Sequence, residues 1–170
     1  MHAMSNGREF RPEILPRRGE LTAWGLSVGL TVLMLIVNSL WGAVPGFVWA
    51  FLTFLLFSAS SISLGNWVDR RTVIRLEAGG IHFENGLRSV SLTWPEVQNV
   101  AVVASRAGKR VQVQGESSHF TFKLYSETRL LGQTMRSGFE GGQEILDTVL
   151  KSSNLVLQGE TQGVYYYGRA

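Results

Sequence analysis

Hydrophobic and polar positions divide this chain into two parts with different patterns. Between Glu20 and Asp69 there is no charged residue and no histidine, and apolar side chains dominate the segment. A membrane-spanning helix needs about 20 apolar residues, because the hydrocarbon core is about 30 Å thick and each residue adds about 1.5 Å. The uncharged segment is therefore long enough for two spans.

A short break separates the two expected spans. Residues 42–46, Gly-Ala-Val-Pro-Gly, favour a tight connection. We predict a transmembrane helical hairpin over residues 21–68, with spans at 21–41 and 47–68. A signal peptide is the alternative for the first span, but its apolar stretch is too long, no small-residue cleavage site follows it, and a second span comes directly after.

Basic residues flank the expected hairpin on both sides. Arg17 and Arg18 precede the first span, Arg70 and Arg71 follow the second, and the connection carries no charge. Positive charge is retained on the cytoplasmic side of a membrane. We therefore expect a multi-pass protein of the cell inner (cytoplasmic) membrane with both termini cytoplasmic, and these four arginines are candidates for topology signals and lipid contact.

Small residues recur at helical spacing near the cytoplasmic end of both spans. Gly25 and Gly29 form a G-x-x-x-G pair, and Ser61 and Gly65 repeat this spacing in the second span. Small side chains let helix backbones approach closely in a membrane. We expect these residues to pack the hairpin, with homodimerisation through them as the alternative. Neither span carries the ionisable groups that transporters use, which favours an anchor or docking surface.

Beyond the hairpin the pattern changes to alternation with a period of two, which is typical of half-buried strands. Turn glycines, including Gly80 and Gly86, separate the strands. Residues 145–150 then follow a helical period with one apolar face. The strands are predicted at residues 72–77, 81–84, 88–93, 97–104, 110–114 and 119–125. The expected fold class is a membrane α-hairpin plus an α+β domain: an antiparallel β-barrel or sandwich closed by a C-terminal amphipathic helix.

Four regions follow from these patterns. Residues 1–20 form a cytoplasmic N-terminal arm, 21–68 the hairpin, 69–155 the β domain, and 156–170 a tail. In the tail, Tyr165, Tyr166 and Tyr167 lie in a segment able to form an extra strand or hairpin. Such an aromatic strand is suited to contact a partner at a sheet edge, and packing on its own domain or on the membrane interface is equally open.

Three short motifs carry a resemblance to a known family. They are Gly80-Ile81-x-Phe83, Trp94-x-Glu96-Val97-x-x-Val100 and Glu144-Ile145-Leu146-x-x-Val149-Leu150. In this order after two apolar helices, they resemble the bacterial pleckstrin-homology-like (PH-like) proteins, most closely the YcxB-like membrane proteins. The resemblance implies a PH-like fold with the turn at Trp94 packing between two strands, and it implies no catalytic residue.

Composition narrows the chemistry further. The 170 residues include no cysteine, and the basic and acidic residues after residue 69 are nearly balanced. This excludes a disulfide scaffold and lacks the positive field of a nucleic-acid binder. His82 and His119 lack metal-ligand spacing, and no nucleophile or phosphate-loop motif occurs. We expect no enzyme activity, no cofactor, no metal and no nucleic-acid partner.

The sequence favours a non-enzymatic, membrane-anchored PH-like interaction module. It would act as a scaffold or accessory subunit that presents its β domain to a membrane or cytoplasmic protein at the inner membrane. The alternative is a sensor of anionic lipid or envelope state, acting through the flanking arginines and the turn residues Arg106, Lys109 and Arg110.

Overall fold

The structure is a computed structural model that describes residues 7–13, 17–42, 44–105, 108–130 and 133–169. The chain forms two compact units. One is Pro16–Trp67, and the other combines Met1–Leu15 with Val68–Ala170. The second unit is thus built from both ends of the chain, whereas the sequence suggested an N-terminal arm separate from the β domain.

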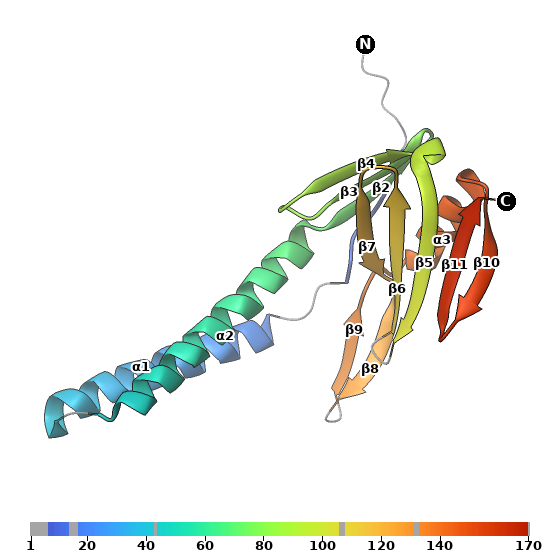
Figure 1. Cartoon of the computed structure of the whole chain (residues 1–170). Helices are drawn as coiled ribbons and strands as arrows, with labels where there is room; N and C mark the ends of the chain where they lie inside the picture. Colours follow the sequence, from blue (N-terminus) through green and yellow to red (C-terminus); the bar gives the residue numbers. More distant parts are fainter. Residues whose placement is uncertain (1–6, 14–16, 43, 106–107, 131–132, 170) are drawn as a thin grey trace, which may run out of the picture. The chain divides into compact units, whose positions relative to one another are not determined.

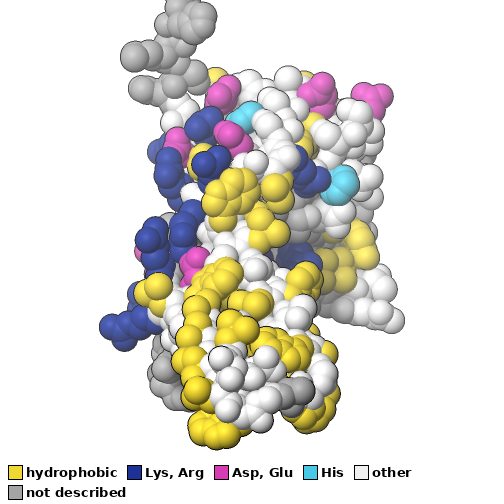
Figure 2. Space-filling model, turned by 90° about the vertical axis from the view of Figure 1, so that its left-hand side faces the viewer, with side chains coloured by type: hydrophobic (Ala, Val, Ile, Leu, Met, Phe, Trp, Pro, Cys, Tyr) yellow, Lys and Arg dark blue, Asp and Glu magenta, His cyan; other side chains and the backbone are white. Residues whose placement is uncertain are grey.

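The first unit is a helical hairpin of α1 (Arg18–Trp41) and α2 (Gly46–Arg71), whose last residues already belong to the second unit (Figure 1). Both helices are long and apolar enough to cross a membrane. Large hydrophobic side chains such as Leu26, Phe54 and Phe57 are exposed along them, and Figure 2 shows hydrophobic side chains gathered over the hairpin. Apolar surface of this extent suggests membrane association.

The connection between the helices is closed by two local features. Gly42 follows α1 with a φ of +100°, a conformation that residues with a Cβ rarely adopt. The Oδ1 atom of Asn38 accepts a hydrogen bond from the backbone N–H of Val44 at 3.0 Å. The side chain of Asn38 therefore satisfies a backbone donor of the turn.

The predicted packing of the hairpin through its glycines was wrong. A Cβ atom added to Gly25, Gly29 or Gly65 would meet nothing within 4 Å, and Ser61 is exposed. The helices face each other through neighbouring positions, where Ser27, Leu52 and Ala59 are buried. The contact face is thus rotated away from the glycines on both helices.

A polar cluster joins the helices near the chain ends of the hairpin. The indole Nε1 of Trp24 donates to the Ser63 hydroxyl at 2.8 Å, and this hydroxyl donates to Glu20 at 2.9 Å. The amide of Asn66 donates to the second oxygen of Glu20 at 3.0 Å. Glu20, which the sequence placed outside the first span, lies in the first turn of α1 and accepts hydrogen bonds from α2.

The second unit contains two main antiparallel sheets, a small third sheet and one helix (Figure 1). The four-stranded sheet has the order β1-β2-β3-β4, the five-stranded sheet the order β10-β11-β5-β6-β7, and β8 pairs with β9. The bounds are β1 (Arg8–Phe10), β2 (Val73–Glu77), β3 (Gly80–Glu84), β4 (Ser89–Thr93), β5 (Val97–Ser105), β6 (Gly108–Gly115), β7 (His119–Lys123), β8 (Ser126–Leu130), β9 (Gln133–Ser137), β10 (Leu155–Thr161) and β11 (Val164–Arg169). The helix is α3 (Gly142–Ser152), and a 3₁₀ turn, η1 (Trp94–Glu96), connects β4 to β5.

The expected helical hairpin followed by antiparallel strands is present. The helix α3 is followed by the β10–β11 hairpin, which is one of the forms expected of the tail. The polar segment after residue 125 forms β8 and β9, which alternation did not reveal. The described strands form three separate sheets, so barrel closure is not seen among them.

Strand β1 ties the N-terminal segment to the rest of this unit. Its residue Glu9 lies opposite Arg75 of β2, although the whole hairpin separates the two residues in the sequence. Phe10 packs against the core, and a Cβ added to Gly141 would lie 2.5 Å from its ring. The Arg8 guanidinium also pairs with Glu144 of α3. The segment before the hairpin is therefore part of the fold that follows it.

The core lies between the two main sheets and α3. Ile74, Phe120 and Ile145, from β2, β7 and α3, are fully buried, and the Phe83 and Phe120 rings stack at 5.0 Å between centroids. Alternation along the strands places these side chains on the inner faces. The apolar face of α3, predicted from its spacing, covers the same core.

The three predicted structural residues each have a local geometric role. A Cβ on Gly80 would lie 2.2 Å from the Leu92 carbonyl oxygen, so only glycine fits there. Gly86 has a φ of +75°. It lies in the four-residue loop between β3 and β4, where the Asn85 side chain accepts hydrogen bonds from the N–H groups of Leu87 and Arg88. Trp94 packs against the core and its Nε1 donates to the Ala78 carbonyl at 2.9 Å.

Removal of one hydroxyl should weaken the hairpin. We expect Ser63→Ala to lower its unfolding free energy by about 1 kcal/mol, because Trp24 and Glu20 each lose a partner in a weakly hydrated site. The measurement is a titration of the full chain from mild detergent into SDS, followed by circular dichroism.

Matched controls separate this effect from loss of helix propensity. Ser60→Ala removes a hydroxyl that bonds only to Leu56 of its own helix, and Gly25→Ala tests the outward glycine face. Both should leave the transition in place. A larger loss from Gly25→Ala than from Ser63→Ala would contradict the packing described here.

Candidate functional site

A cleft of about 500 Å³ opens in the β-containing unit beside the last turn of α2. Its lining comes from residues before the hairpin, from the end of α2 and from β5, β6 and β7. Its polar lining includes Glu13, Asp69, Asn85, Arg110, His119 and Lys123. Residues from both sides of the hairpin in the sequence therefore line the cleft.

The floor of the cleft is the edge of the hydrophobic core. Phe83, Phe122 and Phe139 line it and are themselves buried, and the Phe122 and Phe139 rings meet edge to face at 5.9 Å between centroids. These rings are locked by packing, so they give the cleft a rigid base. Its walls carry the polar groups.

Two cations face each other on one wall. Arg110 of β6 lies directly opposite Lys123 of β7, and both side chains are exposed. Neither forms an ion pair with any residue in the part of the chain that the structure describes. Like charges at opposed strand positions repel each other. The pair is therefore unfavourable by itself and would be stabilised by an anion.

Two carboxylates line the same cleft. Asp69 lies in the last helical turn of α2, and Glu13 lies just after β1, where its backbone N–H donates to the Gly138 carbonyl at 2.8 Å. The nearest ion-pair partner of Glu13 is Arg136 at 4.0 Å, and Arg136 also lies 3.0 Å from Glu127. The cleft thus combines positive and negative groups that do not neutralise one another directly.

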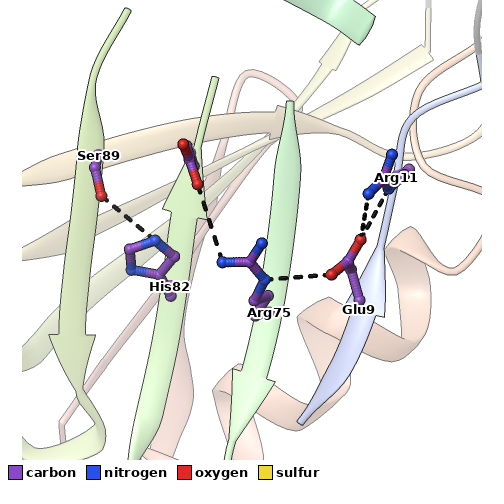
Figure 3. Close-up of polar contacts among 6 residues, drawn as sticks. Glu9, Arg11, Arg75, His82 and Ser89 are labelled. Carbon is purple, nitrogen blue, oxygen red and sulfur yellow. Dashed lines mark hydrogen bonds and ion pairs between the residues drawn. The ribbon is translucent and has the colours of Figure 1, made fainter. Parts of the chain in front are cut away.

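The outer face of the four-stranded sheet is a contrasting surface, because its charges are paired (Figure 3). Glu9 accepts a hydrogen bond from Arg11 at 2.8 Å and one from Arg75 at 3.3 Å. Arg75 also lies 3.9 Å from Glu84 on the next strand. Hydrogen bonds from Arg11 and then Arg75 hold the pKa of Glu9 below its ordinary value. This row stabilises the sheet and leaves little charge for a ligand.

His82 and Ser89 complete this row. Their Nε2 and Oγ atoms form a long hydrogen bond of 3.4 Å (Figure 3). The second histidine, His119, lines the cleft. Within the described ranges no group of three or more His, Cys, Asp or Glu side chains is placed to hold a metal ion.

The predicted partner-binding tyrosines lie within the sheet. Strand β11, which carries Tyr165, Tyr166 and Tyr167, pairs with β10 on one side and β5 on the other. Tyr165 and Tyr167 pack against the core, whereas Tyr166 is 48% exposed on the outer face. Of the possibilities left open by the sequence, packing of the tail on its own domain is the one observed.

This sheet has two edge strands, which are β7 and, beside the tyrosine strand β11, β10. Val156 and Leu157 of this strand are 49% and 55% exposed, and Val156 shares the outer face with Tyr166. We call Val156, Leu157 and Tyr166 the β10 patch. Among the residues outside the hairpin whose side-chain exposure the structure describes, Leu87 is the one other large hydrophobic side chain that is exposed. A bulge between Leu157 and Gly159 divides β10 into two regularly paired stretches, Leu155–Leu157 and Gly159–Thr161.

The remaining predicted contact residues lie at the ends of the hairpin. Arg17 and Arg18 lie at the start of α1, and Arg70 and Arg71 lie in the last turn of α2. At the C-terminal end of α2, positive charge is favourable to the helix dipole. Arg106, proposed from sequence as a lipid contact, lies outside the described residues.

The sequence analysis missed Lys123 and the carboxylates of the cleft. Strand alternation shows on which face of the sheet Lys123 lies, but it does not show which residues from other elements lie near it.

Comparison with protein-family models, curated proteins and solved structures gave no match.

Acid should weaken the β-containing unit partly through Glu9. Because its pKa is lowered in the folded state, the ionised carboxylate stabilises the fold at neutral pH, and this contribution is lost as the pH falls through that pKa. Glu9→Gln should therefore lose less stability between pH 7 and pH 3 than the wild type. Urea unfolding of the full chain in detergent measures this difference.

The control for this experiment is Glu116→Gln, a turn carboxylate that makes no ion pair with a described residue. It should show the same acid sensitivity as the wild type. Equal acid sensitivity of Glu9→Gln and the wild type would contradict the role of the Arg11–Glu9–Arg75 row.

Proposed function

We propose that this protein is a non-enzymatic, membrane-anchored interaction module. The hairpin anchors it in the cell inner membrane, and the β-containing unit lies on the cytoplasmic surface, where it binds a protein partner as a scaffold or accessory subunit. The observation that carries this proposal is the pairing of β1, before the hairpin, with β2, after it. One folded unit on one side of the membrane requires the chain to cross the membrane an even number of times.

The charge distribution supports the cytoplasmic placement. Arginines occur at both ends of the hairpin and none occurs in its connection, and the cytoplasmic side retains such residues. The resemblance to the PH-like membrane proteins agrees with a hairpin followed by a β domain, and it remains a prediction for this chain.

The partner-binding surface that we propose is the β10 patch. Strand β10 is an edge strand among the described residues, and three of the four large hydrophobic side chains described as exposed outside the hairpin belong to the β10–β11 pair. An extended segment of a partner can add to such an edge through main-chain hydrogen bonds, while Val156 and Leu157 contact its side chains. The bulge after Leu157 interrupts β10, and we place the added strand along the first stretch because it carries Val156 and Leu157.

Site-specific photocrosslinking tests this surface. The full chain, carrying a benzophenone amino acid at position 157, is irradiated in intact cells, and the adducts are identified by mass spectrometry. We expect one dominant adduct with another protein. Val156→Lys should reduce it at least about fivefold, because a lysine at an edge opposes strand addition.

The control places the same crosslinker at Gln143, an exposed position on α3, and the substitution Gln143→Lys tests an added charge there. Neither should reproduce or alter the adduct. The same adducts from both positions, an adduct insensitive to Val156→Lys, or an adduct with a second copy of this chain would each refute binding of a protein partner at β10.

A further inference from the structure

We propose that the cleft beside α2 binds a zwitterionic phosphate ester, the head group of an aminophospholipid such as phosphatidylethanolamine. This inference rests on the membrane anchoring proposed above, and it concerns a different surface from the β10 patch. The ligand class follows from the charges of the cleft, and its source follows from the position of the cleft along the chain.

The cation pair accounts for the phosphate. Arg110 and Lys123 are opposed, exposed and without an ion-pair partner among the described residues. A phosphate bridging them would replace repulsion with two charge-assisted hydrogen bonds, one from a planar guanidinium and one from an ammonium. Neutral donors, including the side chain of Thr121, line the same wall.

The carboxylates account for the amine. A site for a purely anionic group would be weakened by Asp69 and Glu13, which line the same cleft. A primary ammonium carries three N–H donors and satisfies carboxylate acceptors, whereas a quaternary ammonium has none. A ligand with a phosphate and a primary amine therefore matches all four charged groups, and a simple anion matches only two.

The position of the cleft indicates a lipid source. Val68 and Asp69 lie in the last turn of α2, and Thr72 follows it. If α2 spans the membrane, these lining residues are the first ones after the membrane-spanning part of the helix. They would then lie at head-group depth. The β3–β4 loop, whose Asn85 lines the cleft, also carries Leu87, which is 66% exposed and suited to insert into the membrane interface.

Native mass spectrometry of the full chain tests this assignment. The protein, in a mild detergent, is titrated separately with phosphatidylethanolamine, phosphatidylcholine and phosphatidylglycerol of the same acyl chains, and retained lipid is counted. We expect phosphatidylethanolamine to be retained best. Lys123→Gln and Asp69→Asn should each weaken its binding on the order of tenfold, since each removes one charge-assisted contact.

Two substitutions on α3 are matched in charge. Lys151→Gln and Asp147→Asn alter exposed residues that do not line the cleft, and both should bind the lipid as the wild type does. Equal retention of the three lipids, preference for phosphatidylglycerol, or equal losses from the α3 variants would overturn the proposal.

A soluble arm distinguishes the source of the ester. Free O-phosphoethanolamine, added without lipid, should bind only weakly, because it lacks the acyl chains that place the head group at the cleft. Tight binding of the free ester without lipid retention would overturn the lipid source. The crosslinking at position 157 does not involve Lys123 or Asp69, so the partner proposal and the lipid proposal can fail independently.

Discussion

The fold depends on one pairing, that of β1 with β2 across the inserted hairpin. Glu9 lies opposite Arg75 although the two helices separate them in sequence. Closing such a long loop costs conformational entropy, and the hairpin reduces this cost by returning the chain to its starting side. Phe10 against the core and Arg8 against Glu144 then fix β1 in place. The cleft also depends on the pairing of β1 with β2, because its lining residues Glu13 and Asp69 come from opposite ends of the hairpin.

The hairpin itself is held by polar contacts rather than by close packing of glycines. Glu20 accepts hydrogen bonds from Ser63 and Asn66 of the facing helix, while Gly25 and Gly65 face outward. An unsatisfied carboxylate or hydroxyl is costly where water is scarce, so these hydrogen bonds favour one rotation of the helices. Glycines allow close approach but do not by themselves specify which faces meet.

Much of the fold could be predicted from local patterns, and much of the site could not. Alternation located β2 to β7, and the apolar spacing around Ile145 located α3. Strand β1 was missed because three residues, Arg-Glu-Phe, carry no periodic signal, and its pairing is non-local. The cleft was missed for the same reason: Lys123 and Asp69 are ordinary surface residues in sequence, and only tertiary structure places them on one cavity. The tyrosines were noticed correctly as unusual, but sequence could not decide between an edge strand and an inner one.

The central claim is most directly tested by disulfide trapping between β1 and β2. Opposed residues of antiparallel strands have Cα atoms about 4.5–5.5 Å apart, within the range that a disulfide bridges, and the chain has no cysteine of its own. Glu9→Cys/Arg75→Cys in the full chain, oxidised in native membranes, should form an intramolecular disulfide detected as a mobility shift that reductant reverses. The control pair Glu9→Cys/Ser91→Cys, which places the second cysteine two strands further along the sheet, should remain reduced. Failure of the first pair to crosslink, or equal crosslinking of both pairs, would contradict the account.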